Sequence, residues 1–190
     1  MKIIFATHNE NKVKEVREML PPSVEIVSLR EMDYHEEIEE TGTTIEENSK
    51  IKAETIFQKY QVPVLAEDTG LEVESLDNAP GVYTARYAGA DAQADDNMNL
   101  LLKNLENHKN RKAQFKTVAT FITKNTSNQY LGIVRGQILE DKKGDYGFGY
   151  DPIFSPAGYS KSFAQLGARE KSLISHRAFA IKKFLQDLEI

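Results

Sequence analysis

The chain has 190 residues, of which 40% are hydrophobic and 28% are charged, and its formal net charge is −5 at pH 7. This length and composition fit one globular domain with a sizeable core and exclude a largely disordered chain. The negative charge disfavours a general nucleic-acid binder, and the absence of cysteine removes disulfides, thiolate catalysis and cysteine-based zinc sites.

The apolar run at the amino terminus is far shorter than a signal peptide, and no stretch approaches the roughly 18 apolar residues of a membrane span. We therefore expect one domain over residues 1–190 with two lobes, located in the cytoplasm, that binds neither membranes nor nucleic acids.

The first segment predicts a strand, a polar turn and a helix. Lys2–Ala6 is an apolar run, Thr7–Lys12 is polar, and apolar residues then recur at helical spacing up to Pro21. A helix start offers unpaired N–H groups and partial positive charge, which suit phosphate, and Lys12 would add a full charge. The alternatives are that Asn9 is only a helix cap and that Lys12 is a surface lysine.

A second strand and a second helix follow. Val24–Leu29 predicts a strand, and six of the ten residues in Glu31–Glu40 are acidic, which usually indicates a solvated loop. One of these acids could instead turn inward to a cation. Thr44–Tyr60 predicts a helix that begins with a capping box, and Lys52 lies at the edge of its apolar stripe. Such a lysine usually points to solvent, but it can also point into a cleft.

The next stretch places two acids beside a buried segment. Val62–Ala66 is apolar and is followed by Glu67 and Asp68, a Thr69–Gly70 turn and an alternating strand, Leu71–Ser75. In open α/β sheets, ligands bind beyond the carboxyl ends of strands, so these acids are candidates for binding a metal or a water. An ordinary turn explains the same residues equally well.

The middle of the chain predicts a helix over Asp95–Leu105 and a hairpin. The hairpin consists of two long β patterns, Ala113–Lys124 and Gln129–Glu140, separated by a polar turn. We expect these two strands to form the second lobe of a mixed sheet.

Two unusual segments complete the chain. Lys142–Pro152 packs three glycines, three aromatic residues and two aspartates into eleven residues, which suits stacking on a flat ring, although a plain glycine-rich loop is the alternative. A helix is expected from about Glu170 to about Leu188, with His176 and Arg177 in its first turns. Cations there oppose the helix dipole, so a bound anion, a nucleobase or an acidic neighbour should compensate them.

Together these motifs resemble one family, the inosine triphosphate pyrophosphatases, also called XTP/dITP diphosphatases. The resemblance covers essentially the whole chain and rests on five motifs in the family's order: FATHNENKVKEV, EETGTTIEENSKIKA, VLAEDTGLEVESLDNAPGVYTARYAG, GDYGFGYDPIF and EKSLISHRAFA. It implies an α/β fold with an elongated mixed central sheet flanked by helices, two lobes with the active cleft between them, and a homodimer.

The resemblance also implies roles for individual residues. Asp68 matches the general base, and Glu40 and Asp68 match the ligands of Mg²⁺, while Glu39 and Glu67 remain open as further ligands. The substrate contacts are expected at Thr7, His8, Asn9, Glu10, Asn11, Lys12, Lys52, Thr69, Phe148, Gly149, Tyr150, Asp151, Lys171, His176 and Arg177. Among these, Thr7, Asn9, Lys12 and Lys52 match phosphate contacts, and the residues from Phe148 onward match the enclosure of the base.

The chemistry has its own physical logic. A nucleoside triphosphate carries about four negative charges, so lysines and Mg²⁺ are needed before a nucleophile can approach phosphorus. Because the chain has no cysteine and no serine-triad spacing, the expected nucleophile is water, activated by the metal and Asp68. Attack on the α-phosphorus would release pyrophosphate and a nucleoside monophosphate. Donors such as Arg177 and His176 would favour the 6-oxo group of hypoxanthine and xanthine over the amino group of adenine.

Two departures and two rival functions accompany this prediction. His8 stands where the family often has glycine or asparagine, and Glu67 where aspartate is common; these positions bear on substrate fine-tuning and not on the reaction. A regulatory nucleotide-binding protein without catalysis is one rival, which the intact Glu40 and Asp68 disfavour. A related pyrophosphatase with pyrimidine or modified-base preference is the other.

Overall fold

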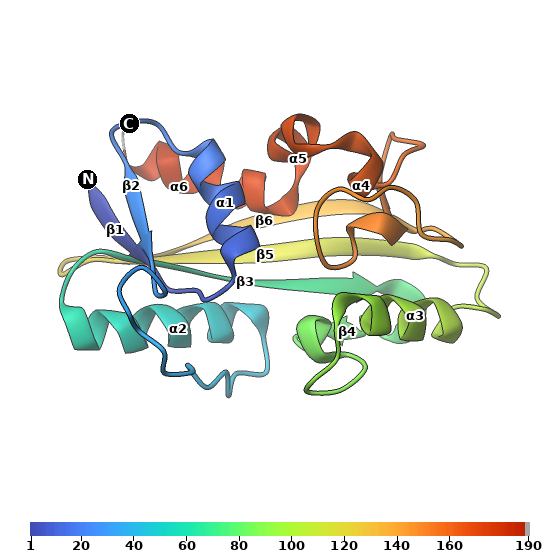
Figure 1. The fold of residues 1–190 in the computed structure, drawn as a ribbon, viewed down its shortest axis with the longest axis horizontal. Coiled ribbons are helices and arrows are strands. Elements are labelled where there is room, and N and C mark those ends of the chain that lie inside the picture. The colour runs from blue at the N-terminus through green and yellow to red at the C-terminus, as the bar shows by residue number, and fades with distance from the viewer. Residues whose placement is uncertain (189–190) are drawn as a thin grey trace. The chain divides into compact units, whose positions relative to one another are not determined.

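The structure, a computed structural model, describes residues 1–188, which divide into two compact units (Figure 1). Unit 1 consists of Met1–Asp68, Thr117–Gly132 and the chain from His176 onward. Unit 2 consists of Thr69–Lys116 and Ile133–Ser175.

The strands form one mixed sheet in the order β2-β1-β3-β5-β6-β7, with β4 paired to β3. β1 runs parallel to β2 and β3, whereas the β3–β4 and β6–β7 pairs are antiparallel. The predicted fold class, a mixed α/β sheet flanked by helices, is confirmed. The strands are β1 (Lys2–Phe5), β2 (Glu25–Ser28), β3 (Val64–Val73), β4 (Pro80–Gly81), β5 (Lys112–Ile122), β6 (Ser127–Ile138) and β7 (Phe154–Pro156).

The helices begin where the sequence supplies caps. Asn9 caps α1 by accepting from the backbone N–H groups of Asn11 and Lys12, and Thr44 starts α2 with a complete capping box. Both predicted helix starts are confirmed. The α-helices are α1 (Glu10–Met19), α2 (Ile45–Tyr60), α3 (Ala94–Asn104), α4 (Phe163–Leu166), α5 (Ala168–Ile174) and α6 (His176–Asp187), and 3₁₀ turns lie at Glu74–Leu76, Thr84–Arg86 and Asp151–Ile153.

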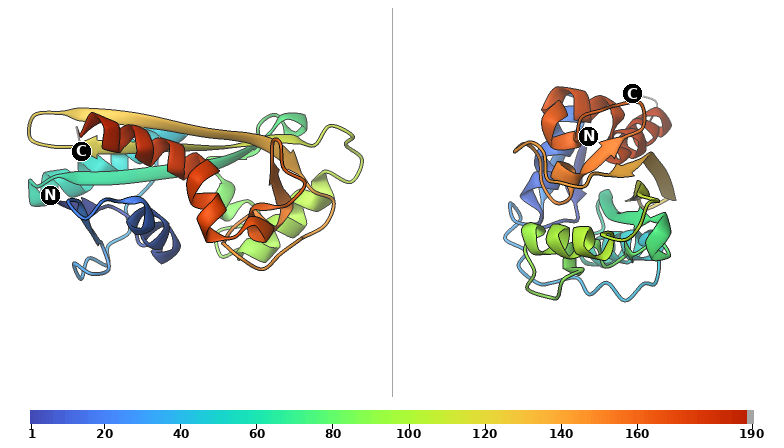
Figure 2. Two further views of the ribbon diagram at one scale, coloured as in Figure 1. Left: turned by 90° about the horizontal axis from the view of Figure 1, so that it is seen from above. Right: turned by 90° about the vertical axis from the view of Figure 1, so that its right-hand side faces the viewer.

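In unit 1 the central strands β1 and β3 are buried on both faces. α2 lies on one face, and α1 and α6 lie on the other (Figures 1 and 2). Successive residues of a strand point to opposite faces. Ile3 and Phe5 therefore pack with α1 and α6, whereas Ile4 and Ala6 pack with Ile56 of α2.

Unit 2 has a separate core. Leu101 and Leu105 from the segment of α3 pack with the ends of β3, β5 and β6. Three aromatic rings fill its centre: Phe115 and Phe154 lie edge to face with centroids 4.7 Å apart, and Phe163 stacks on Phe154 at 5.3 Å. This aromatic cluster holds β7 and α4 beside the glycine-rich segment that precedes them.

The strand expected to end at Glu67 and Asp68 does not end there. β3 runs without interruption from Val64 to Val73, so the predicted Thr69–Gly70 turn is wrong. Acidic residues and a glycine normally disfavour a strand interior. Here Glu67 and Asp68 are buried and each has a cationic partner, and these contacts outweigh the local preference.

Two other predictions need correction. The β5–β6 hairpin exists, with a turn in which Thr123 and Thr126 hydrogen bond, but both strands contribute residues to both units and do not form one lobe. The helix expected over residues 170–188 is two helices, because Ser175 is extended between α5 and α6. His176 and Arg177 are nevertheless in a first turn, as predicted, since α6 begins with them.

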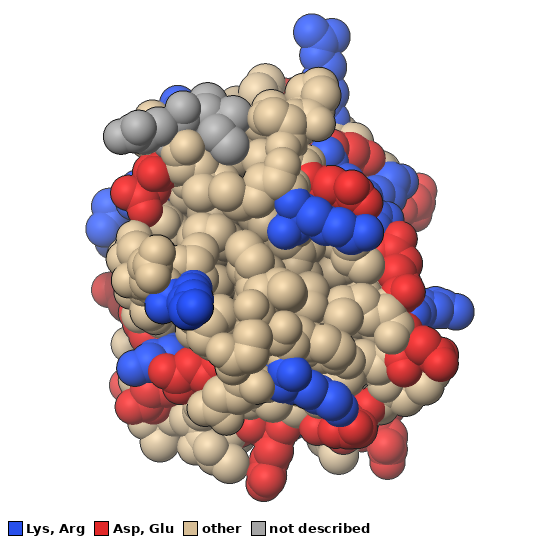
Figure 3. Space-filling model, turned by 90° about the vertical axis from the view of Figure 1, so that its left-hand side faces the viewer, with Lys and Arg blue, Asp and Glu red and all other residues tan. Residues whose placement is uncertain are grey.

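Figure 3 shows the face of the molecule at the left-hand side of Figure 1. Its charged side chains lie mainly around the edge, where lysines and arginines alternate with acids, and the centre of this face is uncharged. Among the described residues on this face, lysines and arginines form no continuous basic stripe of the kind that tracks a nucleic-acid backbone. Within residues 1–188, none of the helices combines the length and the apolar character needed to cross a membrane.

Candidate active site

The two adjacent acids of β3 point to opposite faces of the sheet. Glu67 shares its face with Leu65, which packs with α1 and α6, and Asp68 shares its face with Ala66, on the side of α2. Pairing between β1 and β3 ends at Phe5 and Leu65, so both acids lie just beyond the carboxyl end of β1. The acids were expected at the carboxyl end of their own strand, which is wrong, since β3 continues through them; they lie instead beside the carboxyl end of the neighbouring β1.

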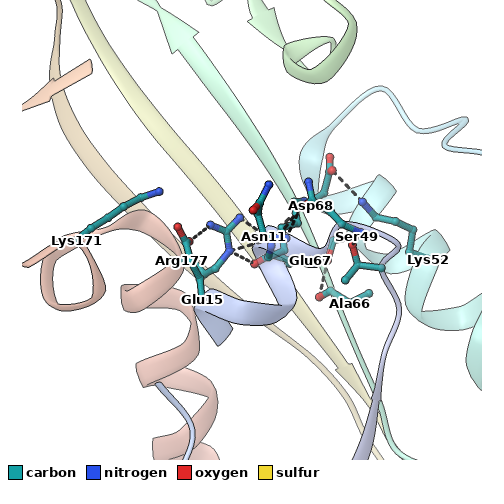
Figure 4. Close-up of polar contacts among 12 residues, drawn as sticks. Asn11, Glu15, Ser49, Lys52, Ala66, Glu67, Asp68, Lys171 and Arg177 are labelled. Carbon is teal, nitrogen blue, oxygen red and sulfur yellow. Dashed lines mark hydrogen bonds and ion pairs between the residues drawn. The ribbon is translucent and has the colours of Figure 1, made fainter. Parts of the chain in front are cut away.

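On the α2 side, one lysine joins two carboxylates. Lys52 Nζ lies 2.9 Å from Asp68 Oδ1 (Figure 4). It also lies 2.6 Å from Glu40 Oε1. Lys52 and Asp68 are buried, and the Glu40 side chain is 25% exposed. Of the alternatives open for these residues, Lys52 points inward and Glu40 turns in from the acidic loop.

The segment after Glu40 is tied to the start of α2. The Gly42 N–H donates to Asn48 Oδ1 at 2.8 Å, and the N–H groups of Thr43 and Thr44 donate to Glu47. A Cβ on Gly42 would lie 2.6 Å from Asn48 Oδ1, so only glycine fits this approach without displacement. These contacts hold the loop that carries Glu40 next to Lys52.

Asp68 has the features of a general base and a metal ligand. Its Oδ2 is buried and has no hydrogen-bond partner among the described residues, while its Oδ1 accepts from Lys52. Burial raises the pKa of Asp68, although Lys52 and Lys12 oppose the change. Burial also opposes protonation of Lys52, but Asp68 and Glu40 outweigh it and raise the pKa of that lysine.

The Glu40–Asp68 pair suits Mg²⁺. Both side chains offer carboxylate oxygen, and both converge on the one cationic centre of Lys52. No group of three or more histidine or acidic side chains gathers around a possible metal position in the described chain. Two carboxylates fit an ion that keeps several waters better than one that needs an all-protein cage.

On the other face of β3, Glu67 and Arg177 form a fully buried ion pair. Arg177 Nε lies 2.8 Å from Glu67 Oε2, and Nη2 lies 2.6 Å from Oε1. Arg177 Nη1 contacts Glu15 Oε2 at 2.6 Å, and Lys12 Nζ lies 3.3 Å from Glu67 Oε1. Both Glu67 and Arg177 are 1% exposed. Of the compensating groups considered for the cations at the start of α6, the structure shows acidic neighbours, Glu67 and Glu15.

The electrostatics of this cluster follow from burial and pairing. Burial alone would raise the pKa of Glu67, but Arg177 and Lys12 outweigh it and hold that pKa at about 2. Burial would likewise lower the pKa of Arg177, and Glu67 and Glu15 reverse the effect. Lys12 differs, because burial lowers its pKa despite Glu67.

The loop between β1 and α1 is held by its own polar groups. Thr7 Oγ1 accepts from the Asn9 N–H at 3.1 Å, and Asn9 caps α1. The exposed His8 ring stacks on Tyr34 with centroids 6.1 Å apart, and its Nε2 lies 3.1 Å from the carbonyl oxygen of Glu36. His8 thus joins this loop to the acidic loop. Glu10, Asn11 and Lys12 form the first turn of α1.

Unit 2 gathers a second group of candidate residues. Lys171 Nζ, on α5, lies 2.6 Å from Asp151 Oδ2 and 4.8 Å from the centre of the Phe148 ring. The Phe148 N–H donates to Asp151 Oδ2 at 2.9 Å, and the Tyr150 hydroxyl donates to the Thr84 carbonyl. Gly149 has a positive φ of 62°, which glycine adopts readily. The structure therefore brings the glycine-aromatic loop and Lys171 together.

The structure brings predicted site residues into three groups: Glu40, Lys52 and Asp68 on the α2 side of β3, Lys12 and Arg177 around Glu67, and Phe148, Asp151 and Lys171 in unit 2. Thr69 is half-buried in β3, and His176 is buried at the start of α6. Sequence reasoning missed Glu15, whose only signal is that it lies three residues after Lys12 on the same side of α1. It also left Glu67 open as a further metal ligand, and the structure shows this acid buried and paired with Arg177.

Comparisons with known proteins agree along nearly the whole chain. The Ham1 family profile matches residues 3–187. A dITP/XTP pyrophosphatase of Flavobacterium johnsoniae is 49% identical over 185 residues, which cover 97% of this chain and 96% of the relative. One from Christiangramia forsetii is 47% identical, with 99% of each chain covered. The Ham1 protein of Staphylococcus aureus has a similar structure, with a TM-score of 0.90 and 36% identity over 100% of this chain and 98% of the other.

Proposed function

This chain belongs to the Ham1 family, and we propose on that premise that it hydrolyses non-canonical purine nucleoside triphosphates, such as dITP and XTP, to the monophosphate and pyrophosphate. Such an enzyme removes deaminated purines from the nucleotide pool. The chain is a nucleoside-triphosphate pyrophosphatase, as its relatives are named.

One observation of the structure supports the chemistry most directly. The buried Asp68 has an oxygen without a hydrogen-bond partner among the described residues, and it shares Lys52 with Glu40. A base, a phosphate-binding cation and a second carboxylate are thus within one cluster of unit 1. These are the groups that in-line attack by water on a polyphosphate requires.

Asp68 acts as the general base in this proposal. Its raised pKa makes the carboxylate more basic than an exposed aspartate, which improves proton removal from water near neutral pH. The water attacks the α-phosphorus, its proton passes to an oxygen of Asp68, and the bond to the bridging oxygen of pyrophosphate breaks.

Glu40 and Asp68 would hold Mg²⁺ through carboxylate oxygens, and Asp68 Oδ2 is the oxygen that has no other partner among the described residues. When bound, Mg²⁺ would offset phosphate charge. Lys52 and Lys12 supply the remaining positive charge, and the N–H groups at the start of α1 add their partial charges. Glu67 is not included as a ligand, because Arg177 and Lys12 already engage it.

The base end of the substrate is assigned to the glycine-aromatic loop and to α5 and α6. Phe148, Tyr150 and the backbone at Gly149 suit stacking and close approach, and Asp151 and Lys171 supply polar groups. His176 would donate to a 6-oxo group, which adenine lacks. Arg177 is buried and paired with Glu67 and Glu15, so its expected contact with the base would require one of these ion pairs to open. The homodimeric state, the cytoplasmic location and the cleft expected between two lobes remain predictions from the family resemblance.

A substrate panel tests this function. At saturating Mg²⁺, dITP and XTP should be hydrolysed with kcat/KM at least about 100-fold higher than dATP, because a donor left unpaired in a dry pocket is costly. The measurement is pyrophosphate release from dITP, XTP, dATP, dGTP and dCTP at equal concentration. Orthophosphate as the first product, or a preference for dCTP, would refute the proposal.

A further inference from the structure

The Lys52 ammonium occupies the centre of the candidate cation site. It contacts Glu40 Oε1 and Asp68 Oδ1 at 2.6 and 2.9 Å, and no described residue provides a second cation within that pair. The side chains of Lys52 and Asp68 are only 11% and 10% exposed, so solvent screens the contact weakly. The lysine is therefore the counter-ion of both carboxylates in the structure.

Lys52 and a divalent cation compete for the same oxygens. Two carboxylates and one ammonium leave a net charge of −1, and an added divalent ion would meet an ammonium already between its ligands. Two cations a few ångströms apart in a partly buried site repel strongly. An ion can bind both carboxylates well only after the ammonium has moved away.

The substrate provides the reason for that movement. A triphosphate carries about four negative charges and offers Lys52 a new partner. The lysine can follow, because its charge lies at the end of a flexible four-carbon chain. Its ammonium group has only the two carboxylate contacts to give up among the described residues.

We propose that Lys52 keeps divalent metal out of the Glu40–Asp68 pair until a polyphosphate draws its ammonium group away, so that metal binds with the nucleotide and not before it. This inference rests on the proposed function, because that function supplies the polyphosphate. It gives Lys52 a second role, as the internal cation that sets the order of binding. It also explains why a lysine is buried between two acids that the reaction needs for a metal.

Mn²⁺ binding without nucleotide tests the inference. The free-ion signal in electron paramagnetic resonance is measured for the wild-type protein, for Lys52→Gln and for Lys59→Gln. Lys59 lies on the same helix and pairs with Glu36 at the surface, so its variant removes an equivalent charge away from the site. Lys52→Gln should bind Mn²⁺ at least about tenfold more tightly than the wild type, because a competing charge is gone. Lys59→Gln should bind as the wild type does.

Two further measurements separate the possible outcomes. Lys52→Arg keeps the charge and should bind Mn²⁺ as weakly as the wild type, which a purely structural role for Lys52 would not predict. The wild-type protein provides a test that needs no variant: tight Mn²⁺ binding without nucleotide overturns the inference. Unchanged affinity in a folded Lys52→Gln protein also overturns it. Pyrophosphate release from dITP by the wild type is measured in parallel, and its absence would refute the proposed function but not the competition at the acid pair.

Discussion

Replacing Asp68 with asparagine should lower kcat for dITP by about 10²–10⁴-fold, the usual contribution of a general base. Asparagine has nearly the same shape, and its amide oxygen can still accept from Lys52, so the fold and the position of the lysine should be kept. It cannot take a proton from water. Binding of a non-hydrolysable dITP analogue should change much less than kcat, because the lysines that hold the phosphates remain.

The measurement is steady-state hydrolysis at several Mg²⁺ concentrations up to saturation, which separates a lost base from weakened metal binding. Asp91→Asn is a matched control, because Asp91 is exposed and has no assigned role. Its rate should equal that of the wild type. A near-normal rate for Asp68→Asn at saturating Mg²⁺ would show that another group accepts the proton.

Replacing Glu67 with glutamine should destabilise the protein by about 3–5 kcal/mol, the usual cost of removing one partner of a buried ion pair. Arg177 would keep its charge, because the guanidinium does not deprotonate in proteins, and would lose its closest counter-ion while Glu15 remains. The free energy of unfolding is measured by urea denaturation at pH 7. The control is Glu25→Gln on the surface of β2, which removes an exposed ion pair with Lys2. It should leave the free energy of unfolding unchanged.

The lowered pKa of Glu67 determines how its contribution to stability changes with pH. The pKa of Glu67 is about 2 in the folded protein, below its ordinary value of 4.5, so its ionised form is stabilised by folding. That stabilisation is complete above about pH 4.5 and is lost as the pH falls toward 2. The difference in free energy of unfolding between the wild type and Glu67→Gln should therefore become smaller as the pH falls over this range. A constant difference down to pH 3 would contradict the assignment of the charge to Glu67.

Local features of the fold were predictable from the sequence because their causes are local. Asn9 and Thr44 start helices through hydrogen bonds within three residues, and the β5–β6 turn depends on Thr123 and Thr126. The continuity of β3 through Glu67 and Asp68 was not predictable in this way. It depends on partners that are 110 residues away in the chain for Glu67 and 16 for Asp68.

The candidate site also combines features that were predictable from the sequence with others that only the structure shows. The resemblance identifies Asp68, Glu40 and Lys52 as site residues, and the chemistry of their side chains explains why such residues are needed. Only the structure shows that Lys52 lies between the two acids, and that Glu67 faces away from Asp68 toward α1 and α6. The alternation of one strand separates two adjacent carboxylates into a catalytic candidate and a structural ion pair.

The most direct test of the central claim is hydrolysis of dITP in ¹⁸O-labelled water, followed by mass spectrometry of both products. Attack of water on the α-phosphorus predicts one ¹⁸O atom in the nucleoside monophosphate and none in the pyrophosphate. Label in the pyrophosphate, or labelled orthophosphate as the first product, would mean that water attacks another phosphorus and would contradict the account.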